Sequence, residues 1–271
     1  MSRFRSRQGA RAAIFAGTVP TILASATLAA TLVSVPAGAA HAATPCSSLE
    51  IQAHRGYHYG SIDQNTIRSF NEANARGYTI ETDVWRDAQG QLWIYHDRDV
   101  SKLTNGTGFI DQMTTAQVRA LRYKKAGSRL PTFEAAVAAW GNYPTRRIYI
   151  EPKQRSAIPA MARQLQDAGL VSNIYFAGYW DYVERNFPAF PTQPESSAYY
   201  DPSRWARNDA VMTGVQSMTP GRVAAYHEAG LEVLHFRNNT TTAWENAIRL
   251  NFDGIMTDRP NELRAFCPTV R

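Results

Sequence analysis

The sequence has no internal repeat, no low-complexity segment and no interdomain linker after its first 42 residues. With 44% hydrophobic and 19% charged residues, it has the composition of an ordinary globular protein, which excludes a disordered chain, a collagen and a coiled coil. Cysteine is scarce, since the 271 residues include only Cys46 and Cys267. The absence of a linker predicts that residues 43–271 form a single domain.

Beyond those first 42 residues the sequence also lacks a large excess of positive charge. The formal net charge of +6 depends mainly on Arg3, Arg5, Arg7 and Arg11, which lie in a segment that has no acidic residue. Without this segment, 25 basic residues face 23 acidic residues, which is a net charge of +2. No run of Lys or Arg that could follow a phosphate backbone is left, so we expect no nucleic acid as a partner.

Residues 1–42 are typical of a secretory signal peptide. Four spaced arginines precede a small and apolar stretch, Ala12 to Val35, and Ala40-His41-Ala42 matches the small-x-small cleavage pattern. The alternative is an uncleaved membrane anchor, because the apolar stretch is long enough to span a bilayer. The sequence has no adjacent arginine pair and no lipobox before Cys46, which argues against twin-arginine export and a lipoprotein. We therefore expect a secreted, extracellular protein that begins at Ala43 and has no stable membrane anchor.

The two cysteines lie near the two ends of the predicted mature chain. An oxidising compartment would allow Cys46 and Cys267 to form a disulfide, and two unpaired thiols are the alternative. In the chain-entropy description, a loop of this length stabilises the fold by about 5 kcal/mol.

Short β-rich apolar runs alternate with stretches of helical periodicity, which is the pattern of repeated βα units around a parallel sheet. The predicted strands are residues 49–53, 79–85, 92–95, 147–150, 173–177, 198–200, 210–214, 231–236 and 252–256. The predicted helices include residues 66–76, 132–140, 157–168, 220–229 and 242–250. Nine strands are one too many for an eight-stranded barrel, so we expect either 198–200 or 210–214 to be irregular. The prediction is an α/β chain with a (β/α)8 TIM barrel, and a doubly wound sheet is the alternative.

Acidic residues occur on two of the predicted strands. Glu81 and Asp83 are two positions apart in a strand, so both side chains point to the same face. Two carboxylates in a barrel interior repel each other, and with Glu151 from another strand a bound cation relieves this repulsion best. Because oxygen ligands favour Mg²⁺ or Ca²⁺ over Zn²⁺, one of these two ions is the expected cofactor. A solvated edge strand with its acids outside is the alternative.

Histidines and other cationic residues follow the same predicted strands. His54 and His96 come from different strand ends, and two imidazoles beside a held group suit proton removal and proton donation near neutral pH. Arg55 and Lys153 add cationic donors, and a guanidinium fork matches a phosphate. This combination predicts a site for a phosphate ester. The sequence assigns no role to the other three histidines of residues 43–271: His227 is predicted on a helix surface, and His58 and His235 at the rim.

The order and spacing of these motifs resemble the glycerophosphodiester phosphodiesterase family over about residues 50–262. The segments that carry the resemblance are His54-Arg55-Gly56, Asn65-Thr66, Ile80-Glu81-Thr82-Asp83-Val84, His96-Asp97, Leu103-Thr104-Asn105-Gly106-Thr107-Gly108, Leu130-Pro131-Thr132-Phe133-Glu134, Glu151-Pro152-Lys153 and Asp253-Gly254-Ile255-Met256-Thr257-Asp258-Arg259-Pro260. Any one of these segments alone would be a weak signal, whereas their order along the chain is specific.

The resemblance implies a TIM barrel that hydrolyses glycerophosphodiesters, a small-molecule substrate class, to an alcohol and glycerol 3-phosphate. It implies that His54 and His96 are the catalytic acid and base, without saying which is which. It also implies that Arg55 binds phosphate, that Lys153 stabilises charge on the phosphoryl group, and that Glu81, Asp83 and Glu151 hold one divalent cation, Ca²⁺ or Mg²⁺.

The chain departs from the family pattern at the mouth of the predicted barrel. Gln64 stands where the family usually has the Glu of Pro-Glu-Asn-Thr, so a carboxylate is replaced by a neutral amide. Two other functions are the alternatives to the hydrolysis of glycerophosphodiesters. One is a phospholipase D or sphingomyelinase-like enzyme that acts on intact lipids, and the other is a noncatalytic barrel that binds phosphodiesters.

Overall fold

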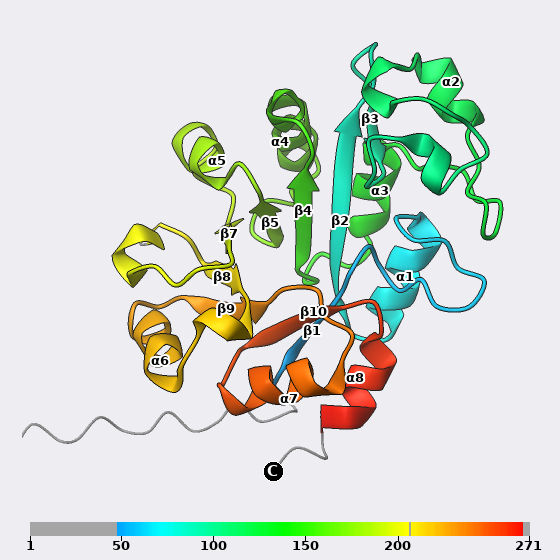
Figure 1. The fold of residues 1–271 in the computed structure, drawn as a ribbon. Coiled ribbons are helices and arrows are strands. Elements are labelled where there is room, and N and C mark those ends of the chain that lie inside the picture. Colours follow the sequence, from blue (N-terminus) through cyan, green and yellow to red (C-terminus); the bar gives the residue numbers. More distant parts are fainter. Residues whose placement is uncertain (1–47, 206, 268–271) are drawn as a thin grey trace, which may run out of the picture. The chain divides into compact units, whose positions relative to one another are not determined.

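The structure is a computed structural model that describes residues 48–205 and 207–267. Nine parallel strands follow one another around a nearly closed barrel, with helices outside it (Figure 1). The strands are β1 (Glu50–Ala53), β2 (Thr79–Arg86), β3 (Leu92–Ile94), β4 (Ile148–Pro152), β5 (Ile174–Ala177), β6 (Thr192–Gln193), β7 (Glu195–Ser196), β8 (Ala210–Thr213), β9 (Glu232–His235) and β10 (Gly254–Thr257). The α-helices are α1 (Ile67–Ala75), α2 (Thr115–Ala120), α3 (Phe133–Trp140), α4 (Ile158–Asp167), α5 (Trp180–Asn186), α6 (Pro220–Glu228), α7 (Thr241–Arg249) and α8 (Pro260–Phe266).

The order of the strands is β6-β5-β4-β2-β1-β10-β9-β8-β7, and β3 lies off this path. The two ends of the path, β6 and β7, are consecutive in the chain and are separated only by Pro194. β6 pairs with β5 and β7 pairs with β8, so together they occupy one position in the barrel. Pro194 has no N–H to donate, although its carbonyl accepts from Met212 N at 2.9 Å. The predicted (β/α)8 barrel is thus confirmed, and the doubly wound sheet is wrong.

Two of the predicted strands have other roles. Residues 92–95 do not form a barrel strand, because β3 pairs antiparallel with β2 through Val84–Ile94 and its neighbours. Residues 198–200 are irregular, in agreement with the expectation that either 198–200 or 210–214 would not form a strand. Residues 192–196 were not predicted as a strand, because this short stretch is interrupted by a proline and has few β-branched residues.

Local signals place several helices as predicted. The N-cap residues Thr66, Thr132 and Thr219 each accept a hydrogen bond from a backbone N–H in the first turn of α1, α3 and α6. The glycines that follow α1, α4 and α6 have φ values of 77°, 70° and 80°, the left-handed conformation that ends a helix at low cost.

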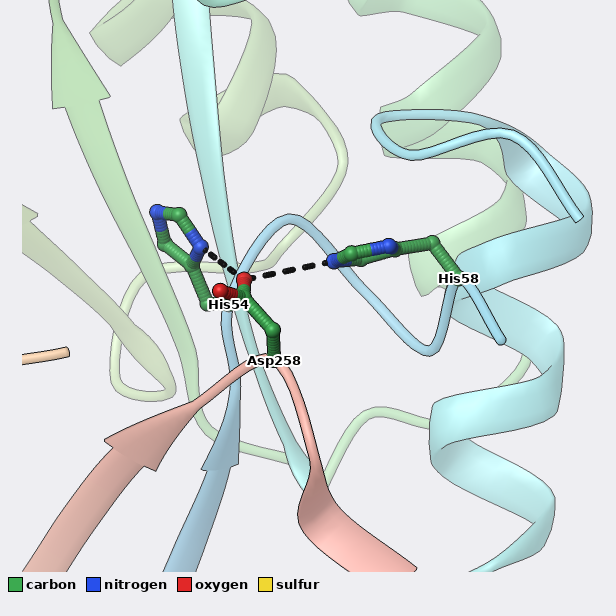
Figure 2. Close-up of side chains that lie close together, drawn as sticks. All are labelled: His54, His58 and Asp258. Atoms are coloured by element: carbon green, nitrogen blue, oxygen red, sulfur yellow. Dashed lines mark hydrogen bonds and ion pairs between the residues drawn. The ribbon is translucent and has the colours of Figure 1, made fainter. Parts of the chain in front are cut away.

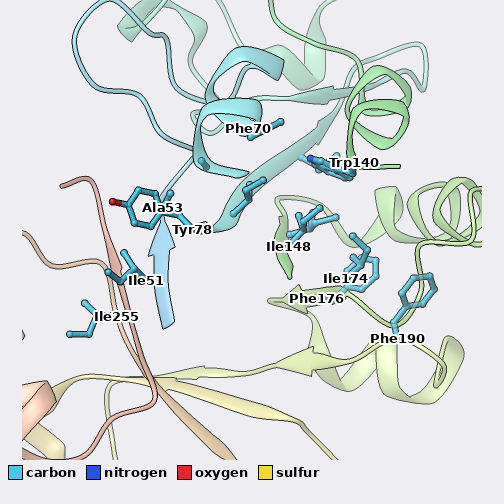
Figure 3. Packing of buried hydrophobic residues seen from close by; sticks show 14 of the residues in the cluster. Ile51, Ala53, Phe70, Tyr78, Trp140, Ile148, Ile174, Phe176, Phe190 and Ile255 are labelled. Atoms are coloured by element: carbon cyan, nitrogen blue, oxygen red, sulfur yellow. The ribbon is translucent and has the colours of Figure 1, made fainter. Parts of the chain in front are cut away.

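The barrel strands bury both faces. Ile148, Ile174 and Ile255 point outward into the main core between strands and helices, part of which is shown in Figure 3. The neighbouring Tyr149, Tyr175 and Met256 belong to a separate cluster inside the barrel, as the alternation of side chains along a strand requires. The same alternation decides which polar residues reach the barrel interior.

The predicted signal peptide and Cys46 lie outside the described residues. Cys267 directly follows α8 and is only 2% exposed. Among the described residues, no helix has both the length and the apolar character needed to cross a membrane.

Candidate active site

The first part of the site is a tight turn at the end of β1. His54 and Arg55 follow the strand, and Gly56 N donates to Ala53 O at 3.1 Å to close the turn. Gly56 has φ of 75°, and a Cβ at this position would lie 2.5 Å from Ser69 Oγ. Glycine is therefore required for conformation and for space, and the turn fixes His54 and Arg55 at the mouth of the barrel.

Asn65 attaches the loop after β1 to β2. Its backbone adopts φ of 52°, which asparagine tolerates better than most residues, and its N–H donates to Arg55 O at 2.8 Å. Its side chain donates to Asp83 Oδ2 and accepts from Thr82 Oγ1, both at 2.8 Å. This buried link holds the Arg55 turn and the Asp83 carboxylate in a fixed relation.

The three acids predicted to hold a cation converge inside the barrel. Glu81 and Asp83 lie on β2 with exposures of 4% and 0%, while Ile80 and Val84 point into the outer core. The solvated edge strand is therefore wrong. Asp83 pairs in register with Glu151 on β4, and carboxylate oxygens of Glu81, Asp83 and Glu151 all lie within 4.8 Å of one another. This all-oxygen donor set fits a hard divalent cation.

Two cationic side chains contact these acids. Lys153 Nζ lies 2.8 Å from Asp83 Oδ1 and 2.7 Å from Glu151 Oε2, and Arg55 Nε lies 3.6 Å from Asp83 Oδ2. Burial raises the pKa of Asp83, but the charges of Lys153, His96 and Arg55 outweigh it and hold the pKa below its ordinary value. Burial lowers the pKa of Lys153, but Asp83 and Glu151 outweigh it and raise the pKa.

Among the three acids, Glu81 is the one whose negative charge is offset least by neighbouring cations. Its Oε2 accepts from Arg55 N at 2.9 Å, but burial and the charges of Asp83 and Glu151 raise its pKa well above the ordinary value. The cluster as a whole has three carboxylates against the two cations of Arg55 and Lys153. An added divalent cation would reverse the sign of this excess and would stabilise the ionised form of Glu81.

His54 reaches Asp258, the residue that follows β10 by one position. His54 Nδ1 lies 2.6 Å from Asp258 Oδ1 (Figure 2). The other ring nitrogen, Nε2, lies 3.9 Å from Glu81 Oε2. Burial lowers the pKa of His54 despite the bond to Asp258. Burial would raise the pKa of Asp258, but its hydrogen bonds to His54 and His58 outweigh this and hold the pKa far below its ordinary value. The pair is thus a neutral imidazole held by an ionised carboxylate.

His96 approaches the acids from the segment after β3. Its Nδ1 lies 3.0 Å from Asp97 Oδ1, and its side chain is 30% exposed against 11% for His54. Trp85 Nε1 donates to the His96 carbonyl at 2.8 Å, which fixes the backbone. Because the charge of His96 contributes to the lowered pKa of Asp83, the imidazole lies within electrostatic reach of the acids. The structure therefore brings all seven predicted polar site residues to one mouth.

Gln64 lies beside this cluster. Its Oε1 accepts from Arg55 Nη1 at 3.3 Å, so the amide that replaces the usual acid of the resembling family contacts the predicted phosphate-binding residue. A carboxylate here would add a fourth acid next to Arg55 and would compete with substrate for its guanidinium.

The sequence analysis missed several residues of the site. The sequence assigns no role to Asp258, because no spacing rule connects this residue to His54, which is 204 residues away. His58 was placed at the rim without a role, but its Nε2 lies 3.4 Å from Asp258 Oδ1. Glu195 on β7 keeps solvent contact, yet desolvation and the charge of Glu151 raise its pKa to about 7.

The other two histidines lie away from the mouth. His235 is only 2% exposed and packs on Phe252 with ring centroids 5.8 Å apart, so its predicted place at the rim is wrong. It points outward from β9 because Leu234, its neighbour in the strand, faces the barrel interior. His227 on α6 pairs with Asp253, with Nε2 2.8 Å from Oδ2.

Comparisons with known proteins agree with this geometry. A sequence model described as the glycerophosphoryl diester phosphodiesterase family matches residues 54–262. A Mycobacterium tuberculosis protein named "Probable glycerophosphodiester phosphodiesterase 2" is 26% identical over 236 residues, which cover 78% of this chain and 88% of that protein.

Solved structures show the same fold. A glycerophosphodiester phosphodiesterase from Parabacteroides distasonis superposes with a TM-score of 0.73 at 21% identity, covering 82% of this chain and 98% of that one. An Oleispira antarctica phosphodiesterase, solved in complex with the product sn-glycerol-3-phosphate, superposes with a TM-score of 0.71 at 20% identity, covering 83% and 100% of the two chains.

Proposed function

Because the chain belongs to the glycerophosphoryl diester phosphodiesterase family and is therefore a phosphodiesterase, we propose that this site hydrolyses glycerophosphodiesters to an alcohol and glycerol 3-phosphate. The observation that carries the proposal is the convergence of three carboxylates, Arg55 and Lys153 within reach of two imidazoles at the mouth of the barrel. Active sites of such barrels lie at this end of the strands.

The charge of the site supports a cation-dependent reaction. Without a metal ion, the carboxylates exceed Arg55 and Lys153 by one negative charge, and a phosphate diester, which is itself an anion, would be repelled. Glu81, Asp83 and Glu151 would hold one divalent cation, Mg²⁺ or Ca²⁺, and this ion would supply the positive charge that draws electrons from the phosphoryl group. Arg55 and Lys153 then neutralise the charge that develops on the phosphate oxygens.

The two histidines divide the proton transfers. Ionised Asp258 holds the proton of His54 on Nδ1, so Nε2, the nitrogen nearer Glu81, keeps a free electron pair. His54 is therefore the base that removes the proton of the glycerol hydroxyl next to the phosphate. His96, which is more exposed to solvent, donates a proton to the leaving alcohol. Water then opens the resulting cyclic phosphate with the two roles reversed, which yields glycerol 3-phosphate.

The mature form is a further part of the proposal. We propose that residues 1–42 direct secretion and are removed, and that Cys46 then bridges Cys267 outside the cell. The burial of Cys267 at the end of α8 suits a structural disulfide. Intact mass spectrometry of the protein from culture medium tests both parts. The expected mass is that of a chain that begins at Ala43, and it increases by the mass of two hydrogen atoms only after reduction of the disulfide.

The decisive test of activity is the release of glycerol 3-phosphate from glycerophosphocholine and glycerophosphoethanolamine by the purified chain with Mg²⁺, Ca²⁺ or EDTA. We expect release with at least one cation and none with EDTA. Glu151→Gln should raise the cation concentration required for half-maximal activity, while Glu134→Gln, a change of an exposed acid on α3, serves as the matched control. Release that persists after exhaustive chelation would contradict the cation, and turnover of intact phospholipid alone would favour the lipid-cleaving rival.

A further inference from the structure

A second group of ligand atoms lies beside the carboxylates. His54 Nδ1 and His58 Nε2 lie 2.6 and 3.4 Å from the same oxygen, Asp258 Oδ1, and approach it from opposite sides (Figure 2). We propose that His54, His58 and Asp258 bind a borderline divalent cation, with Zn²⁺ as the most suitable ion, and that this binding inhibits the enzyme. The inhibition rests on the proposed function, whereas the binding does not.

The donor atoms distinguish this group from Glu81, Asp83 and Glu151. All three side chains of the second group present ligand atoms within 4.8 Å of one another, but two of these atoms are imidazole nitrogens. Imidazole nitrogen selects Zn²⁺, Cu²⁺ or Ni²⁺ over Mg²⁺ and Ca²⁺. One mouth of the barrel thus offers an all-oxygen set for a hard cation and a mixed set for a softer one.

The distances suit a tetrahedral ion after a small adjustment. Ligand atoms about 2.0–2.1 Å from a tetrahedral Zn²⁺ lie about 3.3 Å from each other. The distance from His58 Nε2 to Asp258 Oδ1 already has nearly this value, at 3.4 Å. The 2.6 Å contact of His54 Nδ1 is a hydrogen bond, and its proton has to leave this nitrogen when the ion enters.

Neighbouring groups hold the proposed ligands in place. Asp258 Oδ2 accepts from Arg237 Nη1 at 2.9 Å and from Asn239 Nδ2 at 2.7 Å, which leaves Oδ1 directed at the imidazoles. Lys125 Nζ donates to the His58 carbonyl at 2.7 Å and fixes the backbone of the loop. Hydrogen bonds of this kind orient metal ligands and strengthen binding. The positive charge of Arg237 opposes the ion, but it faces the other oxygen and is half exposed to solvent.

Binding at this site would remove the proposed base. Because a neutral imidazole carries only one N–H, a cation on His54 Nδ1 selects the tautomer with this proton on Nε2, which is the nitrogen that has to accept a proton from the substrate. Zn²⁺ should therefore inhibit turnover while the hard cation stays bound to Glu81, Asp83 and Glu151, and excess Mg²⁺ should not restore activity.

The first experiment is calorimetric titration of Zn²⁺ into the protein saturated with Mg²⁺. We expect one site in the wild type and affinity at least ~10-fold weaker in His58→Asn, since loss of a ligand should cost no less than loss of a supporting group. His227→Asn is the matched control, because His227 also contacts a carboxylate but belongs to neither group of three candidate ligands found in the described ranges. Its affinity for Zn²⁺ should equal that of the wild type.

A second measurement needs no variant and covers the case in which His58→Asn does not fold. X-ray absorption at the zinc edge of the wild-type complex should show scattering from two imidazoles. An oxygen-only shell, an absence of binding, or equal affinity in a folded His58→Asn would overturn the site. Zn²⁺ that binds through the imidazoles but leaves diester hydrolysis unchanged would overturn the inhibition. A protein that hydrolyses no diester with any cation refutes the proposed function and leaves the binding result to decide the site.

Discussion

The two ends of the barrel interior both contain ionised side chains, but they balance charge in different ways. At the end where the strands begin, Arg147 pairs with Glu50 and Glu232, and its guanidinium carbon lies 5.4 Å from the centre of the Tyr175 ring. At the end where the strands finish, Glu81, Asp83 and Glu151 are only partly offset by Lys153 and Arg55.

The difference separates stability from function. At the end where the strands begin, Arg147 contacts the carboxylates of both Glu50 and Glu232, so each acid has a cationic partner within the protein. At the mouth, Glu81 has no ion pair with a Lys or Arg side chain among the described residues, and burial raises its pKa, so this acid calls for a ligand from outside. A cluster whose acids all have cationic partners stabilises the fold, whereas a cluster with an unpartnered acid prepares a binding site.

The largest effect is expected at the mouth, from His54→Ala and His96→Ala. Each substitution should lower kcat by roughly 10² to 10⁴-fold, because a proton transfer loses its donor or acceptor. The melting temperature should change little, since neither imidazole belongs to the core clusters. Rates of glycerol 3-phosphate release and thermal melts check the two parts. His227→Ala, at the other end, should keep wild-type turnover, and an activity within a few-fold of wild type in His54→Ala would remove the assigned base.

Arg147→Met should give the opposite result, a loss of stability without a loss of turnover. This change leaves Glu50 and Glu232 without their cation and should lower the free energy of unfolding by about 1–3 kcal/mol. This range is below that of a fully buried pair, because Arg147 and Glu232 are 35% and 37% exposed and solvent screens them. Urea unfolding measures the loss, and kcat under native conditions should be unchanged. A large fall in kcat in a folded Arg147→Met protein would show that the two ends are coupled.

Gln64→Glu sharpens the comparison by increasing the negative excess at the mouth. A fourth carboxylate beside Arg55 should lower the cation concentration required for half-maximal activity by on the order of 10-fold. It should also raise KM, because the new acid competes with the phosphate for Arg55. Titrations of activity with Mg²⁺ and Ca²⁺ give both values. Gln166→Glu is the control, since Gln166 is an exposed residue in the last turn of α4; an equal shift there would indicate a general charge effect.

The comparison also explains which parts of the site could be predicted from the sequence. Glu81 and Asp83 were predictable because alternation in a strand depends only on spacing, and Ile80 and Val84 mark the outer face. Asp258 and His58 were not, because Asp258 meets the two histidines only where β10 closes the barrel against β1, and it lies 204 residues from His54 and 200 residues from His58.

The fold shows the same division. The helices α1, α3 and α6 agree with the predicted ranges, because each begins at a threonine cap that depends only on local hydrogen bonds. The strand around Pro194 was missed, because two short halves pair with different neighbours and neither has a hydrophobic pattern of its own. Residues 92–95 have the composition of a barrel strand, but the short connection from β2 favours an antiparallel hairpin.

The smallest predicted effect is a pH dependence of the free energy of unfolding. It concerns the end of the barrel where the strands begin, because Asp253 directly precedes β10. The hydrogen bond that His227 donates to the Asp253 carboxylate raises the pKa of His227 above its ordinary value of 6.5 in the folded state. A pKa that is raised in the folded state stabilises the fold. This contribution is fully present at pH values below the pKa of the unfolded state, and it is lost as the pH rises through the pKa of the folded state. The wild type should therefore exceed His227→Gln in stability at about pH 5.5 by up to about 1 kcal/mol, and the difference should shrink by about pH 8.5. Urea unfolding at both pH values measures it. Since Gln can form a neutral hydrogen bond to Asp253 at any pH, a difference that stays constant would mean that His227 does not carry charge in the folded protein.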